Sequence, residues 1–133
     1  MLSRRHLVLL ALSLPALSAC SSWFNGRQPG DTFLVFFDEF DAKLSPDAKS
    51  IIAKAAGQAK QRGVRTLRVE ARTSATGAAD ANMKLAEARA TAVRNALQAD
   101  GIAPTTIQLV PIGQAGTDKV GVDDRRVDII LQD

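Results

Sequence analysis

The chain has 133 residues, which is enough for one domain and hardly for two. Hydrophobic residues make up 46% and aromatic residues only 5%, so a core must be built from Val, Ile, Leu, Ala and a few Phe. The formal net charge is +3, but Arg4 and Arg5 lie in an N-terminal segment without acids. The remaining 15 basic and 14 acidic side chains nearly balance, which argues against a nucleic-acid partner.

Residues 1–20, MLSRRHLVLLALSLPALSAC, begin with basic residues, continue with an apolar run from Leu7 to Leu14 and end in small residues. This layout is typical of a secretory signal peptide, and the apolar run is too short for a permanent transmembrane helix. The alternative is a buried N-terminal strand or helix, which two arginines directly before the apolar run disfavour.

The last four residues of this segment, LSAC, resemble the lipobox of bacterial lipoproteins, in which the cysteine is acylated and becomes the mature N-terminus. Cys20 is the only cysteine, so the chain forms no internal disulfide; either it pairs with another chain or its thiol is used otherwise, and lipidation with fatty acids such as palmitate explains the count. Several acyl chains anchor a protein stably, because each buried CH₂ contributes about 0.8 kcal/mol. By the same resemblance, Ser21 after the cysteine favours the outer membrane.

Residues 21–31, SSWFNGRQPGD, are rich in Ser, Asn, Gly and Pro, and we predict that they form a short flexible tether. Trp23 and Phe24 within the tether could lie at the bilayer interface or cover an edge of the domain. The folded domain is predicted to span residues 32–133.

Strand and helix patterns alternate along this domain. The apolar, β-branched and aromatic run at 32–37 predicts a buried strand. A helix is predicted to follow from Ser45, a suitable N-cap with Pro46 directly after it, to Gly63. Alternation of apolar and polar residues over 64–71 predicts a second strand.

A second helix is predicted from about Asp80 to Asp100, ending at Gly101, and two further strands at 106–112 and 125–131. The order β-α-β-α-β-β predicts an α/β fold with a mixed four-stranded sheet. Each β-helix-β crossover should be right-handed and join parallel strands. The final strand lacks a helix before it and is free to run antiparallel, so both helices can lie on one face.

The second helix carries an arginine inside its apolar stripe. Steps of about 100° per residue place Arg89 between Leu85 and Val93, on the side that should pack on the sheet. A guanidinium costs several kcal/mol there unless it is paired or reaches water. Its charge could reach solvent along the apolar surface, pair with an aspartate such as Asp41 or Asp128, or line a cleft that takes a ligand carboxylate.

Four segments, FFDEFDAKLSPDA, RTSATG, NMKLAEARATAV and DDRRVDI, occur in an order and at intervals that resemble the OmpA-like peptidoglycan-binding domain, over about residues 33–133. The resemblance implies an OmpA-like two-layer sandwich that binds the stem peptide of peptidoglycan through its diaminopimelate. In that family an arginine on the second helix takes the diaminopimelate carboxylate, and Arg89 is the matching residue. Thr73, Asn82 and Arg125 also match the family pattern.

One position departs from the pattern in a way that matters physically. Ser74 stands where the family has the ammonium-binding aspartate, and Arg72 replaces the family's histidine. A hydroxyl supplies no charge, so its substitution should weaken binding by about 1.5–3 kcal/mol, or ten- to a hundredfold. Arg72 would add repulsion if it pointed into the cleft, and Asp80 or Asp124 could replace the missing carboxylate. The candidate ligand-binding set is Thr73, Ser74, Asn82, Arg89 and Arg125.

Two functions are therefore consistent with the sequence. The first is an outer-membrane lipoprotein, anchored by the lipid on Cys20, whose periplasmic domain binds peptidoglycan non-covalently and links the envelope to the cell wall. The second is a domain that has lost diaminopimelate binding through Ser74 and acts as a scaffold for other proteins of the envelope or of a secretion complex.

An enzyme is not expected. The only histidine, His6, lies in the signal segment, and the only thiol, Cys20, is consumed by lipid. No metal-ligand cluster or phosphate-binding glycine loop can be assembled, so neither a metal nor a cofactor is expected. Acid pairs such as Asp38 with Asp41 are interpreted as solvated loop residues.

Overall fold

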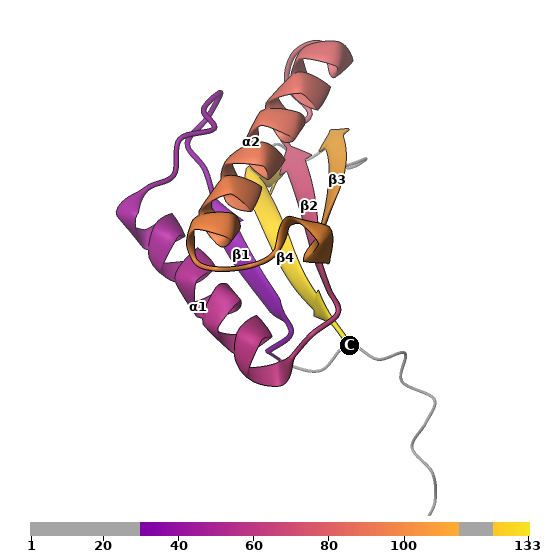
Figure 1. Ribbon diagram of the computed structural model, residues 1–133. Helices are drawn as coiled ribbons and strands as arrows, with labels where there is room; N and C mark the ends of the chain where they lie inside the picture. Colours follow the sequence, from indigo (N-terminus) through magenta and orange to yellow (C-terminus); the bar gives the residue numbers. More distant parts are fainter. Residues whose placement is uncertain (1–29, 115–123) are drawn as a thin grey trace, which may run out of the picture.

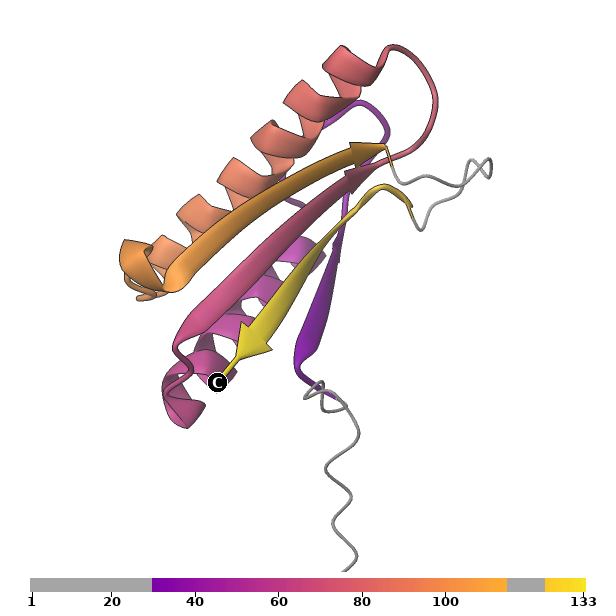
Figure 2. The ribbon, with the colours of Figure 1, turned by 90° about the vertical axis from the view of Figure 1, so that its right-hand side faces the viewer.

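The computed structural model describes residues 30–114 and 124–133. They form two layers, a four-stranded sheet and two helices that cover one of its faces (Figures 1 and 2). This confirms the predicted fold class, an α/β sandwich with a mixed sheet. The signal segment, Cys20 and most of the tether lie outside the described residues. The elements are β1 (Thr32–Phe36), α1 (Pro46–Arg62), β2 (Thr66–Thr73), α2 (Ala79–Ala99), the short 3₁₀ helix η1 (Pro104–Thr106), β3 (Ile107–Gln114) and β4 (Arg126–Gln132).

The strands lie in the order β1-β4-β2-β3, so the last strand of the chain is inserted between the first two. β2 and β3 are parallel, whereas β4 is antiparallel to both of its neighbours. The final strand, which the sequence left free to run antiparallel, does so against both neighbours. β1 and β2 run in the same direction, as expected for strands joined by a helix, but β4 separates them.

The helix ends coincide with the local signals in the sequence. The hydroxyl of Ser45 accepts a hydrogen bond of 3.1 Å from the backbone N–H of Ala48, and Gly63 ends α1 in the left-handed region at φ 64°. α2 ends directly before Gly101, whose φ is 96°. These boundaries lie within one residue of the predicted ones, because caps act through neighbours in the sequence.

Strand boundaries moved further. β2 was predicted at 64–71 but lies at Thr66–Thr73, since its register is set by pairing, with Thr66 opposite Gln132 of β4. β3 contains a bulge, because Ala71 pairs with Pro111 and Arg72 with Gly113.

The glycine in the bulge brings β3 close to the first turn of α2. Gly113 has φ 72°, and a Cβ at this position would lie 3.3 Å from the Cε of Met83. A larger residue would therefore require the Met83 side chain to shift slightly, and it would be strained by the positive φ.

Small residues of the helices pack against branched residues of the sheet. Ala55 and Ala59 of α1 and Ala86 and Ala90 of α2 are buried, which lets both helices approach the strands closely. The sheet and the helices contribute Val35, Ile52, Leu67, Val69, Val93, Leu97, Val127 and Ile129, all without exposed surface. The largest fully buried side chain is nevertheless that of Arg89, which is 1% exposed.

The domain begins at the opposite end of the sheet from the candidate residues. Asp31, which the sequence places at the end of the tether, is buried and forms an ion pair with Arg62 of α1. Arg62 also pairs with Asp133 at 2.8 Å, and the carbonyl of Asp31 accepts a hydrogen bond of 2.8 Å from Leu131. The chain is therefore firmly held where it enters β1.

Candidate functional site

The candidate residues lie around one end of the sheet. β1, β2 and β3 end there, and α2 and β4 begin there (Figures 1 and 2). In open α/β sheets, ligands bind beyond the carboxyl ends of the parallel strands. The fold thus brings five residues to the same end: Thr73 at the end of β2, Ser74 directly after it, Asn82 and Arg89 on α2, and Arg125 before β4.

The guanidinium of Arg89 is bound by the protein's own backbone. Its Nε donates to the carbonyl of Asp41 at 2.8 Å, Nη2 to the carbonyl of Asp38 at 2.9 Å and Nη1 to the carbonyl of Arg72 at 3.2 Å. The ring of Phe37 lies 5.2 Å from the guanidinium carbon, within reach of a cation–π contact. Arg89 therefore ties the β1–α1 loop to the end of β2.

This arrangement differs from the two structural ones considered for Arg89. The side chain does not reach solvent, and Asp41 offers its backbone carbonyl rather than its carboxylate. Asp128 lies on the other face of the sheet, where it pairs with Arg126. Periodicity placed Arg89 in the core but could not identify its acceptors, because they are main-chain atoms 17 to 51 residues away in sequence.

The charge of Arg89 is balanced by dipoles rather than by a bound carboxylate. Burial lowers its pKa below the ordinary value, the charge of Arg125 acts in the same direction, and Asp41 opposes them. Arginine nevertheless stays protonated in proteins. Two guanidinium charges thus act on this end of the domain, and Arg89 meets mainly neutral groups.

The turn that Arg89 holds is strained and carries an exposed aromatic ring. Phe40 has φ 58°, the only described non-glycine residue with a positive φ, and is 71% exposed. The turn closes through a hydrogen bond of 3.3 Å from the Asp41 N–H to the Asp38 carbonyl. Because Arg89 binds the carbonyls on both sides of Phe40, it can hold the turn in this conformation.

Three other candidates are buried and serve the β2–α2 loop. The hydroxyl of Ser74, which is 7% exposed, lies 3.2 Å from that of Thr76, and Asn82 donates to the Thr76 carbonyl at 2.9 Å. Thr73 is 1% exposed, and its hydroxyl has no hydrogen-bond partner among the described residues. These side chains shape the end of β2 from within.

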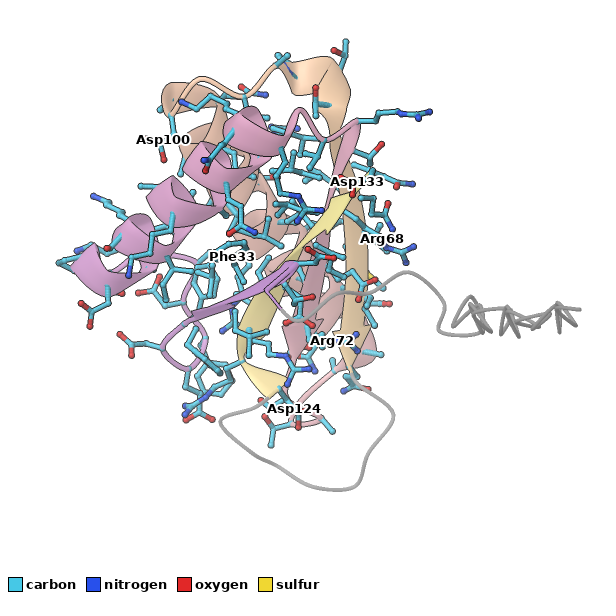
Figure 3. All side chains as sticks on the ribbon, turned by 90° about the horizontal axis from the view of Figure 1, so that it is seen from below. Phe33, Arg68, Arg72, Asp100, Asp124 and Asp133 are labelled. Atoms are coloured by element: carbon cyan, nitrogen blue, oxygen red, sulfur yellow. The ribbon has the colours of Figure 1, made fainter. Side chains whose placement is uncertain are left out.

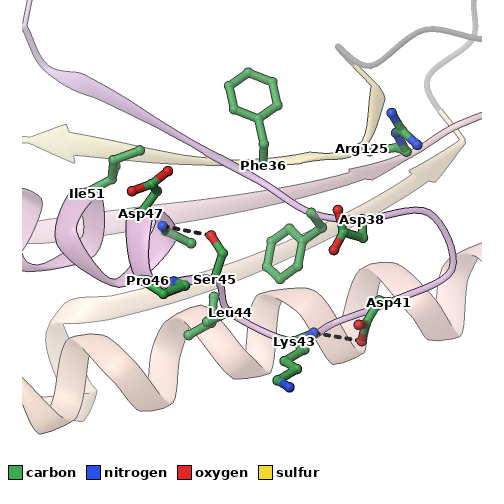
Figure 4. A pocket seen from close by; sticks show the side chains of 12 residues that line it. Phe36, Asp38, Asp41, Lys43, Leu44, Ser45, Pro46, Asp47, Ile51 and Arg125 are labelled. Carbon is green, nitrogen blue, oxygen red and sulfur yellow. Dashed lines mark hydrogen bonds between the residues drawn. The ribbon is translucent and has the colours of Figure 1, made fainter.

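Arg125 is the accessible cation of the candidate set. Its side chain is 26% exposed, and its nearest described ion-pair partner is Glu39, with Nη1 and Oε2 3.9 Å apart. It lines a pocket of about 670 Å³ between the end of β1, the β1–α1 loop and the first turns of α1 (Figure 4). We call this cavity the α1 pocket. Its lining is Phe36, Phe37, Asp38, Asp41, Lys43, Leu44, Ser45, Pro46, Asp47, Ala48, Ile51 and Arg125.

Sequence reasoning did not find the α1 pocket. Asp38 and Asp41 were interpreted as solvated loop residues, and both are indeed exposed, but they lie at the pocket. No local sequence pattern shows that Arg125 lies close to residues 36–51. The two segments are far apart in the chain and become neighbours only because β4 pairs with β1 in the sheet. The one sequence signal for this pocket was Arg125, within the segment DDRRVDI.

The uncovered face of the sheet holds a second group of charges. Glu70 of β2 and Asp128 of β4 are register partners, 8% and 7% exposed. Arg68 and Arg72 bind Glu70 at 2.8 and 3.0 Å, and Arg126 binds Asp128 at 2.8 Å. Along β2, Arg68 lies toward the Asp133 end and Arg72 toward the Asp124 end (Figure 3).

This ionic cluster settles the direction of Arg72. Its side chain points to the uncovered face, and Arg72 Nε lies 3.7 Å from Asp128 Oδ2, so it does not repel a ligand on the helix side. The alternation of Arg68, Glu70 and Arg72 could have indicated such a cluster. The two proposed replacement acids, Asp80 and Asp124, form no ion pair with a described residue; the former is exposed and the latter half-buried.

Within residues 30–114 and 124–133, no group of three or more His, Cys, Asp or Glu side chains is arranged to hold a metal ion. None of the described helices is both long and apolar enough to cross a bilayer.

Comparisons with known proteins agree with this fold. The OmpA family model matches residues 36–126, and the chain belongs to that family. The peptidoglycan-associated lipoprotein of Burkholderia pseudomallei is 23% identical with a TM-score of 0.67, over 75% of this chain and 90% of that one. The OmpA-like domain of FopA1 from Francisella tularensis is 21% identical with a TM-score of 0.66, over 77% and 74%.

The C-terminal domain of MotB from Helicobacter pylori is 19% identical with a TM-score of 0.62, over 75% of this chain and 84% of that one. These structures share the fold. No curated protein sequence is similar enough to count as a match.

Proposed function

We propose that this chain is an outer-membrane lipoprotein whose periplasmic OmpA-like domain binds the stem peptide of peptidoglycan without a covalent bond. The single observation that carries the proposal is the family match over residues 36–126. By the resemblance of the sequence motifs, Arg89 corresponds to the family arginine of the second helix. A similar fold occurs in a protein named a peptidoglycan-associated lipoprotein. The role is binding rather than catalysis.

The lipid anchor is a separate part of the proposal. It depends on LSAC ending in Cys20, which lies outside the described residues. Residues 21–30 would link the domain to the membrane, since Asp31 already forms an ion pair with Arg62 of the domain. This tether of ten residues reaches at most about 35 Å when fully extended.

At the end of the sheet that we propose to bind the wall, the buried and the exposed candidate residues have different roles. Arg89, Thr73, Ser74 and Asn82 are buried and hold the loops after β1 and β2, whereas Arg125 presents a charge toward solvent. In the proposed site, the buried residues shape the binding surface, and diaminopimelate is the part of the wall that it recognises.

Co-sedimentation of the purified full-length chain with isolated sacculi tests this function. We expect retention of the wild type and equal retention of Cys20→Ala, which cannot be acylated, while only the wild type stays with the membrane fraction in cells. A wild type that remains in the supernatant, together with a retained Ser74→Asp variant, would instead support a scaffold that has lost wall binding.

A further inference from the structure

The chain is bound to both layers of the domain where it enters β1. The carboxylate of Asp31, a residue that is 5% exposed, forms an ion pair with Arg62 at the end of α1. One residue earlier, the carbonyl of Gly30 accepts a hydrogen bond of 3.2 Å from Nε2 of Gln58, which also belongs to α1. The carbonyl of Asp31 accepts a hydrogen bond from the backbone of Leu131 in β4. The helix layer and the sheet therefore both hold the entry to the domain.

The other end of β1 is also bound to both layers. The N–H of Phe37 donates to the carbonyl of Arg125 at 2.9 Å, which continues the pairing with β4 beyond the end of the strand. Directly after it, Arg89 binds the carbonyls of Asp38 and Asp41 at 2.9 and 2.8 Å. Because Arg89 belongs to α2, a helix holds the chain where it leaves β1 as well as where it enters.

These two ends of β1 are the two ends of the domain that the proposed function connects. The tether precedes Asp31, whereas the candidate residues lie where β1 stops, at the end that we call the wall end of the sheet (Figures 1 and 2). A pull between membrane and wall would therefore act along β1. This strand pairs with β4 over its whole length, from Thr32 opposite Ile130 to Phe36 opposite Arg126. A force along the strand loads all of its backbone hydrogen bonds together.

α1 offers a second path for the same force. The helix runs from Pro46, which lines the α1 pocket at the wall end, to Arg62 at the entry of the chain. Its backbone hydrogen bonds lie nearly parallel to the helix axis. The ion pair between Asp31 and Arg62 joins the entry to this helix, so a strand and a helix would share the load. Arg62 also binds Asp133, directly after β4, at 2.8 Å.

We propose that the domain is a tension-bearing link, in which β1 and α1 carry force between the membrane tether and the wall end and Arg62 passes force from the tether to α1. This inference rests on the proposed function, because only a chain that is bound at both ends comes under tension. It gives a mechanical role to Asp31 and Arg62, which lie far from the candidate ligand-binding residues.

Optical-tweezers measurements on the full-length chain, produced without acylation, test this role. Cys20 is the only cysteine and provides one attachment point. The second is either Asp124→Cys, at the wall end before β4, or a cysteine added after Asp133, beside the start of β1. We expect the Asp124→Cys geometry to unfold at a clearly higher force. It loads the hydrogen bonds between β1 and β4 together, whereas the other geometry separates the two strands from one end, bond by bond.

Variants of the ion pair test the part of Arg62. Asp31→Asn keeps the shape of the side chain but removes its charge, and in the Asp124→Cys geometry it should unfold about two- to tenfold faster at constant force. Arg62→Gln should have an effect of the same size. Glu70→Gln is the matched control, since it also removes a buried carboxylate from its arginines, but it lies on β2, outside the path of the force. Its unfolding rate under force should stay that of the wild type.

Two results would overturn the inference. One is equal unfolding force in the two geometries, and the other is a Glu70→Gln variant that unfolds under force as fast as Asp31→Asn, since the ion pair would then contribute only to general stability. Sedimentation with sacculi, measured on the same chains, keeps the proposed function separate. A chain that resists force in the Asp124→Cys geometry but is not retained by sacculi contradicts the proposed function, whereas a retained chain with equal force in both geometries contradicts this inference alone.

Discussion

The two faces of the sheet both bury charged side chains, but they compensate them differently. Beneath α2, Arg89 is surrounded by backbone carbonyls, whose dipoles stabilise the guanidinium without cancelling its charge. On the uncovered face, Glu70 and Asp128 are bound by arginines, so opposite charges cancel locally. A buried charged side chain therefore has different effects with different partners. Bound to backbone carbonyls it fixes the conformation of a loop, and paired with an opposite charge it leaves the surrounding surface nearly neutral.

The consequences for function differ accordingly. Three carbonyls from two distant segments depend on one side chain, so Arg89 determines the shape of the β1–α1 loop and of the α1 pocket beside it. The ionic cluster joins neighbouring strands that are already paired by backbone hydrogen bonds. We therefore expect the first arrangement to matter more for stability and for ligand binding than the second.

The largest expected effect is that of Arg89→Leu. Loss of the guanidinium removes one donor from each of three carbonyls and leaves a partly filled cavity, which should lower the free energy of unfolding by about 3–5 kcal/mol. Urea denaturation of the full-length chain measures this, with the exposed Arg65→Leu as control. A loss below about 1 kcal/mol would mean that the loop keeps its conformation without the guanidinium.

Glu70→Gln should have a smaller effect that depends on salt. The amide keeps the shape but loses the charge that faces Arg68 and Arg72, for an expected loss of about 1–2 kcal/mol. The loss should shrink between low salt and about 1 M salt, because the cluster borders solvent and ion pairs are screened. Denaturation of Arg89→Leu at the same salt concentrations is the comparison, and its loss should change little.

The smallest expected effect is a gain in stability from Phe40→Gly. Glycine adopts a positive φ without steric cost, and the exposed ring of Phe40 has little packing to lose, so we expect a gain of about 0.5–1 kcal/mol. Glu39→Gly, next to it at a negative φ, should instead lower stability by a similar amount. Equal losses in both variants would show that the turn is not strained.

Some of the site was predictable because the signal was local in sequence. The stripe of α2 placed Arg89 on the sheet side, and the ordered motifs marked Thr73, Ser74, Asn82 and Arg125. What could not be predicted was whether these side chains face a ligand or one another. That depends on the ends of strands that meet only in the sheet, and the structure shows four of the five buried.

By itself, the sequence determined the type and order of the four strands and two α-helices and the ends of both α-helices. Apolar periodicity and the caps at Ser45, Gly63 and Gly101 act over a few residues of chain, so they are readable without a fold. Only the tertiary structure decided that β4 lies between β1 and β2, that main-chain carbonyls bind Arg89, and that Arg125 faces a pocket beside α1. Each of these joins segments that are distant in sequence, and only the packing of the sheet brings them together.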